Sequence, residues 1–156
     1  MKTLETQVAI IGGGPAGSSL ATFLRQRGIG CVIFEKEKFP RFHVGESLLP
    51  ENVRQFEWLG VADKIRAMGF QVKPGATFIH DVKPDERVKP VRILFKDAYF
   101  RSPPRAFNVK RADFDDLLLR HAVSLGAGLH EEAAVTEFLM DGERGGLGTR
   151  LRSRTA

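Results

Sequence analysis

Apolar positions near the start of the chain form two short runs separated by an amphipathic segment. The first run, 7–11, is typical of a short buried strand and ends in three consecutive glycines. Pro15 suits the first turn of a helix, and the apolar positions after it predict a helix that stops at Gly28. The second run, 31–34, ends at Glu35. Strand, glycine turn, helix and strand within roughly 30 residues predict a βαβ unit, which requires a parallel strand pair and a crossover between its strands.

Beyond this unit the pattern alternates between loops, short helices and short strands. It predicts a loop at 39–50, helices at 51–59 and 61–68, and strands at 71–80 (interrupted by Pro74-Gly75), 91–95, 106–109 and 133–140. Together these elements predict an α/β fold, a mainly parallel sheet with helices on both sides in the manner of a Rossmann domain.

One later helix is predicted in more detail. Asp113 is a plausible N-cap, with Asp115 and Asp116 in the first turn, where the helix dipole favours acids. The helix should run to about Leu125. Its packing face, at helical spacing, should comprise Phe114, Leu117, Leu118, His121, Ala122 and Leu125.

The end of the chain departs from this regular pattern. Asp141-Gly142 is a hairpin turn signal, but the glycines and scattered arginines of 144–156 are poor strand material. We therefore expect an ordered core over about 5–140 and an irregular Arg/Gly-rich tail over 144–156. On this interpretation the chain, 1–156, is the N-terminal portion of a single incomplete domain, as a truncated or frame-shifted product would be.

Composition narrows the possible functions. The net charge is +5, but the four arginines from Arg144 onward account for most of it, so the remainder carries about +1 and predicts no nucleic-acid-binding face. No stretch approaches the roughly 20 apolar residues that span a bilayer. The single cysteine, Cys31, excludes an internal disulfide framework and argues against a cysteine metal cluster, so we expect a cytoplasmic protein without a metal site.

The glycine turn carries a dinucleotide-binding pattern, GxGxxG, directly between a strand and a helix. Gly12 permits the tight turn, Gly14 lets backbone N–H groups approach a pyrophosphate, and Gly17 lets the helix pack against the sheet. The phosphates would then lie at the helix N-terminus, beside Ala16. Glu35, 23 residues after Gly12, can accept hydrogen bonds from both ribose hydroxyls of an adenosine and disfavours a 2′-phosphate.

Several segments together resemble one flavoprotein family. Residues 8–35 resemble the FAD-binding motif of the group that includes aromatic hydroxylases and geranylgeranyl reductases. Past that point, 39–50 (FPRFHVGESLLP) and 68–78 (MGFQVKPGATF) look like two segments of flavin-dependent halogenases, the second of which holds their catalytic lysine. The segment 111–115 (RADFD) resembles a motif whose arginine lies against FAD. PAGS at 15–18 and GES at 45–47 are similar to halogenases of phenols and pyrroles.

The resemblance implies an activity and a set of site residues. Reduced FAD, supplied by a separate flavin reductase, would react with oxygen and a halide to give hypohalous acid. Lys73 would hold the oxidant by a hydrogen bond or as a haloamine, beside a small phenolic or pyrrolic substrate that is free or tethered to a carrier protein. The implied FAD contacts outside the glycine turn are Glu35, Lys36, Arg41, Glu46, Ser47 and Arg111.

Two alternatives stay open at this point. The protein could be a non-halogenating FAD monooxygenase or reductase of the same superfamily, or an inactive FAD-binding remnant. The family's second Gly-Asp motif, its chloride site and its Trp-x-Trp-x-Ile-Pro motif do not occur in 1–156, where Trp58 is the only tryptophan.

Overall fold

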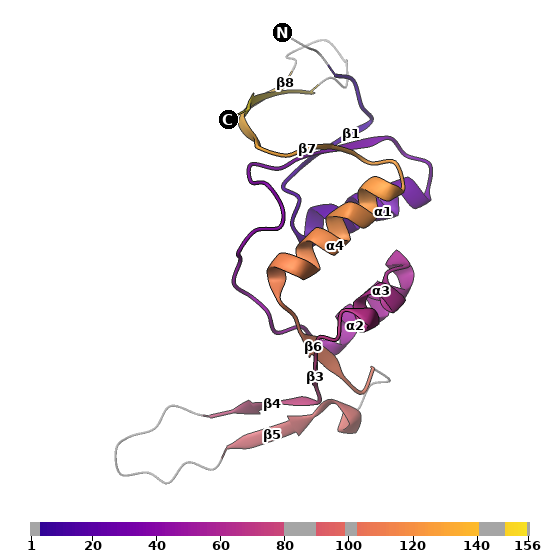
Figure 1. The fold of residues 1–156 in the computed structure, drawn as a ribbon, viewed down its shortest axis with the longest axis vertical. Coiled ribbons are helices and arrows are strands. Elements are labelled where there is room, and N and C mark those ends of the chain that lie inside the picture. Colours follow the sequence, from indigo (N-terminus) through magenta and orange to yellow (C-terminus); the bar gives the residue numbers. More distant parts are fainter. Residues whose placement is uncertain (1–3, 80–89, 99–102, 141–148, 156) are drawn as a thin grey trace, which may run out of the picture. The chain divides into compact units, whose positions relative to one another are not determined.

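The computed structural model describes residues 4–79, 90–98, 103–140 and 149–155 (Figure 1). Contacts within the chain divide it into two compact units. The first comprises Met1–His43 and Arg111–Ala156, and the second comprises Val44–Lys110.

A three-stranded parallel sheet organises the first unit. Its strand order is β1-β2-β7, and these strands are β1 (Val8–Ile11), β2 (Cys31–Phe34) and β7 (Gly128–His130). Helix α1 (Pro15–Gln26) connects β1 to β2, and α4 (Arg111–Ser124) precedes β7. The predicted βαβ unit and the α/β fold are therefore confirmed. Strand β7 was not predicted, because its three residues, Gly-Leu-His, carry no strand signal of their own.

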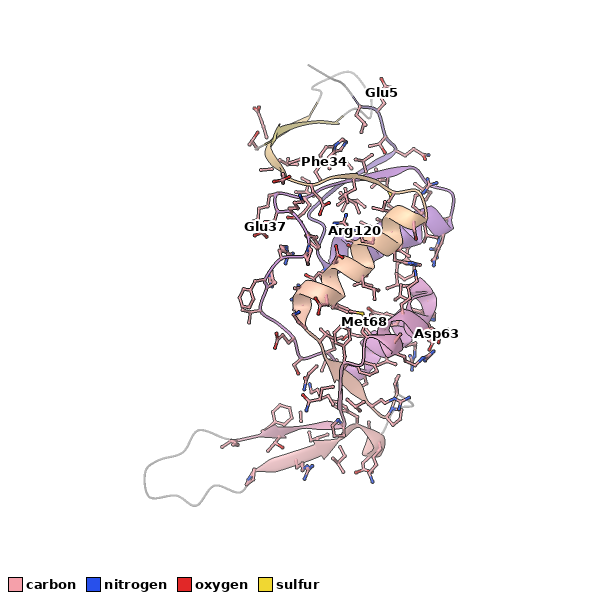
Figure 2. All side chains as sticks on the ribbon, in the orientation of Figure 1. Glu5, Phe34, Glu37, Asp63, Met68 and Arg120 are labelled. Carbon is pink, nitrogen blue, oxygen red and sulfur yellow. The ribbon has the colours of Figure 1, made fainter. Side chains whose placement is uncertain are left out.

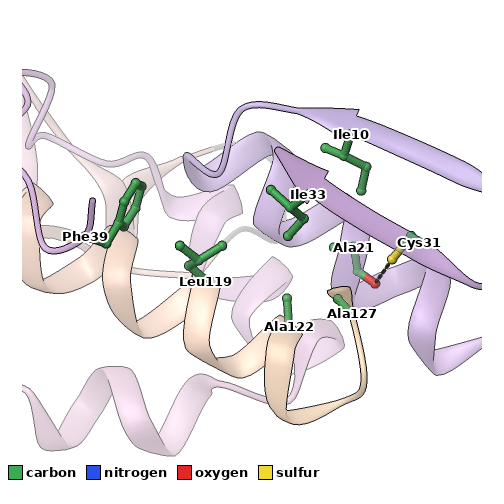
Figure 3. Close-up of a cluster of buried hydrophobic side chains, with 8 residues drawn as sticks. All are labelled: Ile10, Ala21, Cys31, Ile33, Phe39, Leu119, Ala122 and Ala127. Carbon is green, nitrogen blue, oxygen red and sulfur yellow. Dashed lines mark hydrogen bonds between the residues drawn. The ribbon is translucent and has the colours of Figure 1, made fainter. Parts of the chain in front are cut away.

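The core of this unit lies between the sheet and the helices α1 and α4, which pack on each other (Figure 3). Small side chains on α1 allow this close approach, since Ser18 and Ala21 are fully buried and the Ser18 hydroxyl donates to the Gly13 carbonyl at 2.7 Å. The buried apolar cluster consists of Ile10, Ala21, Cys31, Ile33, Phe39, Leu119, Ala122 and Ala127.

Helix α4 corrects the predicted helix start and packing face. It begins at Arg111, so Asp113 lies within the first turn rather than at the N-cap, and Asp115 lies beyond the first turn. Its buried residues are Phe114, Asp115, Leu118, Leu119 and Ala122, while Leu125 is exposed. The predicted packing face is thus confirmed for Phe114, Leu118 and Ala122 and wrong for Leu125. It missed Asp115 because it assigned the face by hydrophobicity, whereas a carboxylate with charged partners is buried there.

The last described strands of the chain form an antiparallel pair in this unit. Strand β8 (Ala133–Met140) pairs with β9 (Thr149–Thr155), with a register shift between Val135 and Glu137. The predicted irregular tail is therefore wrong for Thr149–Thr155. Backbone hydrogen bonds along β8 give this segment strand geometry although its composition is unfavourable. Asp141-Gly142 and the rest of the predicted tail up to residue 148 lie outside the described residues.

The described part of the second unit combines two α-helices with two strand pairs. Its helices are α2 (Pro50–Leu59) and α3 (Ala62–Ala67), close to the predicted bounds. Strand β3 (Gln71–Lys73) pairs with β6 (Ala106–Asn108), and β4 (Gly75–Phe78) pairs with β5 (Val91–Leu94), which the short 3-10 helix η1 (Phe95–Asp97) follows.

The predicted break at Pro74-Gly75 separates strands of two different sheets. Gly75 is required there because a Cβ on it would overlap the carbonyl oxygen of Ile93 on the paired strand. Within the described ranges, no helix is long and apolar enough to cross a membrane, and no group of three or more His, Cys, Asp or Glu side chains could hold a metal ion.

Candidate functional site

The glycine turn between β1 and α1 is shaped by two glycines that the backbone requires. Gly12 has a φ of 98°, a conformation that L residues rarely adopt, and its N–H donates to the Phe34 carbonyl at 2.8 Å. A Cβ on Gly17 would overlap the carbonyl oxygen of Gly12 and lie 3.1 Å from Cγ2 of Ile10. Gly12 therefore makes the turn, and Gly17 lets α1 pack against it.

Gly14 differs from these two glycines because the fold does not require it. As N-cap of α1 it has φ −67° and ψ −177°, which any residue can adopt. The nearest described atom to an added Cβ is Nη2 of Arg41, at 3.5 Å, an ordinary contact distance. A side chain at this position would meet the protein only lightly, so the missing Cβ leaves the N-terminus of α1 accessible to a ligand.

Glu35, at the end of β2, is tied to the same turn. It is only 4% exposed, and its Oε2 accepts a hydrogen bond from the N–H of Gly13 at 2.6 Å. Its Oε1 accepts from the N–H of Glu37 at 2.9 Å. An ionised carboxylate has about four lone-pair sites, so these two bonds leave acceptor capacity for ribose hydroxyls. The structure thus brings Glu35 to the turn, and its ribose contact stays a prediction.

A cluster of two arginines and one aspartate lies beside the turn. Arg111 donates from Nε and Nη2 to the two oxygens of Asp115, at 2.7 and 2.9 Å. The hydrogen bond to Asp115 raises the pKa of Arg111, and burial opposes it. Nη1 of Arg41 lies 3.4 Å from Oδ2 of Asp115, and its Nε lies 3.1 Å from Oε2 of Glu37. The cluster therefore holds two positive and two negative charges, and of its two acids Asp115 is fully buried while Glu37 is about half exposed.

These features fit an anionic diphosphate such as that of FAD. The N-terminus of α1 offers unpaired N–H groups and a favourable dipole, and its first turn contains no acid. Arg41 is largely buried, yet its Nε and Nη1 make no hydrogen bond to any described residue. Its guanidinium also lies over the ring of Phe39, 4.6 Å from the centroid. Its Nη2 is the nitrogen that lies beside Gly14, so a phosphate at the helix N-terminus could accept a charge-assisted hydrogen bond from it.

The second unit holds the candidate catalytic lysine. Lys73, at the end of β3, is half-buried, and its Nζ donates to the Leu48 carbonyl at 3.1 Å. The same Nζ lies 5.4 Å from the centroid of the Phe95 ring. An open hollow of about 260 Å³ adjoins it, and its polar lining residues include Gln71, Thr77, Arg92 and Asn108.

The Gly-Glu-Ser segment runs along β6 in the same unit. Ser47 forms a bridge with Asn108, and the carbonyl of Glu46 accepts from the N–H of Val109 at 2.8 Å. Leu48 directly follows this segment, and its carbonyl accepts the hydrogen bond from Lys73. The structure therefore brings Lys73 close to the Gly-Glu-Ser segment. The side chains of Glu46 and Ser47 are exposed.

Two of the predicted site residues have no described contact that supports a role, and two residues near the site were not predicted. Lys36 and Ala16 are exposed, and no described contact assigns either a role. Sequence reasoning missed Asp115, which it treated only as an acid favoured by the helix dipole. The spacing of Arg111 and Asp115, i and i+4 on a helix, is the signal that could have indicated their pairing. Phe95 carried no such signal.

Comparison with known proteins gives consistent matches over most of the chain. A family model described as an FAD-binding domain matches residues 5–154. A chlorinase of 1H-pyrrole-2-carbonyl peptidyl-carrier protein from Pseudomonas fluorescens is 39% identical, over 91% of this chain and 35% of that protein. Flavin-dependent halogenase armH3 of Armillaria mellea is 40% identical, over 86% of this chain and 26% of that protein.

A solved structure agrees with these sequence matches. The myxobacterial FAD-dependent chondrochloren halogenase CndH aligns with a TM-score of 0.80 and 38% identity, over 94% of this chain and 33% of that chain. The chain thus spans about a third or less of the length of these relatives.

Proposed function

The chain belongs to the FAD-binding domain family, and on that premise we propose that the protein carrying it is a flavin-dependent halogenase. Its substrate is a small phenolic or pyrrolic ring, free or tethered to a carrier protein. The relatives named as halogenases support this reading, and one is named for a carrier-bound pyrrole. The observation that carries the proposal is the Lys73 amine, which the Leu48 carbonyl holds beside the Gly-Glu-Ser segment.

The first unit binds the cofactor in this proposal. The N–H groups at the start of α1 and the Arg41 guanidinium bind the diphosphate, while Glu35 accepts hydrogen bonds from the ribose hydroxyls. Arg111 and Lys36 add positive charge. FAD, when bound in its reduced form, supplies with oxygen the oxidation that converts a halide to hypohalous acid. A separate flavin reductase that delivers the reduced cofactor, and a cytoplasmic location, belong to the same proposal.

Lys73 controls the oxidant in this proposal. As an ammonium it donates a hydrogen bond to the oxygen of hypohalous acid. As a neutral amine it attacks the halogen, so that an N–halogen bond forms, the O–halogen bond breaks, and the released hydroxide takes the amine proton to form water. The aromatic carbon then takes the halogen from nitrogen as the N–halogen bond breaks, and the proton that the ring loses returns to nitrogen and restores the neutral amine. Both routes need a positioned amine, which the Leu48 carbonyl and the Phe95 ring provide.

The test compares three lysine variants in the full-length protein. Lys73→Ala should still bind FAD and consume reduced flavin and oxygen, but give almost no halogenated product. Lys73→Arg should fail as well, because a guanidinium is effectively always charged and cannot act as a neutral amine. Lys96→Ala, which removes an exposed lysine of the same unit, should keep full product formation. Products are measured by mass spectrometry, with chloride and bromide supplied separately.

Each result has a defined meaning. Full halogenation by Lys73→Ala would make Lys73 an ordinary surface lysine and refute its role. Substantial activity of Lys73→Arg would exclude the haloamine and leave the hydrogen-bonded oxidant. A wild-type protein that binds FAD and oxidises reduced flavin without halogenating any phenol or pyrrole would instead be a monooxygenase or reductase.

A further inference from the structure

Among the described residues of the first unit, Asp115 is the most deeply buried charged group, and the FAD-binding role proposed above does not use it. Its side chain is 0% exposed, and it faces guanidinium groups on two sides. Arg111, one turn earlier on α4, binds both of its oxygens. Arg41 approaches Oδ2 from the loop that follows β2. A buried carboxylate is costly unless it is paired, so this acid needs both arginines in place.

The three guanidinium nitrogens of Arg41 have different neighbours. Two of its nitrogens face acids, since Nε lies 3.1 Å from Glu37 and Nη1 lies 3.4 Å from Asp115. The third nitrogen, Nη2, lies 3.5 Å from the position that a Cβ of Gly14 would occupy. The two acids therefore lie against Nε and Nη1 of the guanidinium, and the remaining nitrogen, Nη2, lies beside the N-terminus of α1.

We propose that Asp115 is a positioning residue for the diphosphate, which holds Arg41 and Arg111 so that Arg41 presents Nη2 to phosphate oxygens at the glycine turn. This inference rests on the proposed FAD-binding function. It assigns to an acid a favourable effect on the binding of an anion. Direct electrostatics alone would give the opposite sign, because a carboxylate repels a phosphate.

The direction in which ADP affinity changes on Asp115→Asn shows whether Asp115 acts by positioning Arg41 or only through its own negative charge. Asp115→Asn keeps the shape of the side chain but makes the cluster more positive. If Asp115 acts only through its charge, this variant should bind ADP more tightly. If it positions Arg41, the amide can no longer hold two guanidinium groups, and ADP should bind about tenfold or more weakly.

The experiment measures ADP and adenosine binding by calorimetry to the full-length protein freed of FAD. Asp115→Asn should weaken ADP binding and leave adenosine binding unchanged, because adenosine has no phosphates. The matched control is Asp116→Asn. This neighbouring acid on α4 pairs at 3.0 Å with Arg120, a residue labelled in Figure 2, and it does not contact Arg41 or Arg111 in any described ion pair. Both affinities should therefore match the wild type.

A second variant covers the case in which Asp115→Asn does not fold. Arg41→Gln leaves Asp115 bound to both nitrogens of Arg111, and it should weaken ADP but not adenosine binding. Unchanged or tighter ADP binding by a folded Asp115→Asn, unchanged binding by Arg41→Gln, or equal loss of ADP and adenosine, would each overturn the inference. A wild-type protein that binds neither FAD nor ADP would refute the proposed function itself.

Discussion

Replacement of Gly14 by alanine separates the needs of the fold from those of the ligand at the glycine turn. The φ of −67° and ψ of −177° at Gly14 suit alanine, and the new Cβ would meet Nη2 of Arg41 at an ordinary 3.5 Å. Alanine also restricts the unfolded chain. The free energy of unfolding should therefore stay the same or rise by about 0.4–1 kcal/mol.

The effect on FAD affinity should be much larger and of opposite sign. The added methyl group lies at the N-terminus of α1, where the phosphates must approach the backbone N–H groups. We expect the loss of one or two charge-assisted hydrogen bonds, at about 1.5–3 kcal/mol each. The Kd for FAD should then rise at least tenfold.

Gly17→Ala provides the contrasting variant. Its Cβ would overlap the Gly12 carbonyl oxygen, so α1 or the turn must move, at a cost of about 1–3 kcal/mol of stability. FAD affinity and unfolding are measured on the same preparations of full-length protein, by titration of flavin fluorescence and by denaturation in urea. Wild-type FAD affinity in a stable Gly14→Ala protein would refute this account of the turn.

Two further predictions concern groups outside the glycine turn. Burial raises the pKa of Glu131, but two hydrogen bonds from Arg120 at 2.9 Å and the N–H of Phe39 at 2.8 Å outweigh it and hold that pKa below its ordinary 4.5. The stabilisation, about 1 kcal/mol, is present above the unfolded-state pKa and is lost as the pH falls through the folded-state pKa. Urea denaturation should therefore show Glu131→Gln less stable than wild type at pH 7, with the gap closing below pH 4.5; a constant gap would contradict this. Burial also raises the pKa of the Cys31 thiol, and the positive charge of Arg25 opposes this effect only in part. Because the thiol is buried and protonated, a disulfide reagent should label Cys31 only after unfolding. Rapid labelling of the native protein would contradict this prediction.

The βαβ unit could be predicted because its signals are local. The apolar runs, the glycine turn and Pro15 each lie within the element that they specify, and the structure places strands and helix within a residue or two of the predicted bounds. The signal for the break at Pro74-Gly75 is equally local, since proline lacks an N–H to donate to a strand partner.

The missed strands are strands because of their pairing, not because of their own composition. β7 is a strand because Gly128 and His130 align with Val32 and Phe34 of β2, nearly a hundred positions earlier. No local window of sequence contains that pairing. β9 is different, because it pairs with the nearby β8, with Met140 opposite Thr149, and it was missed only because the composition of Thr149–Thr155 outweighed the turn signal before it.

The domain organisation and the site show the same distinction between local and distant information. The expectation of one domain over 1–156 stays a prediction, although contacts within the chain form two compact units. The positions of Gly12, Gly17 and Glu35 follow from a motif of fixed spacing, and the structure joins Glu35 to the turn through the N–H of Gly13. The roles of the individual FAD contacts stay predictions as well.

The arginine cluster shows why a list of candidate residues is not yet a site. Arg41 and Arg111 were each predicted to contact FAD, from motifs 70 positions apart in the chain. Asp115 is the group that relates them, because it is buried and contacts both. Two free arginines would repel each other and lose side-chain entropy on binding a phosphate. In the proposal above, the shared carboxylate reduces the repulsion between the arginines and their loss of side-chain entropy before the ligand binds. Asp115, which was not predicted as a site residue, would thus allow Arg41 and Arg111 to bind one diphosphate together.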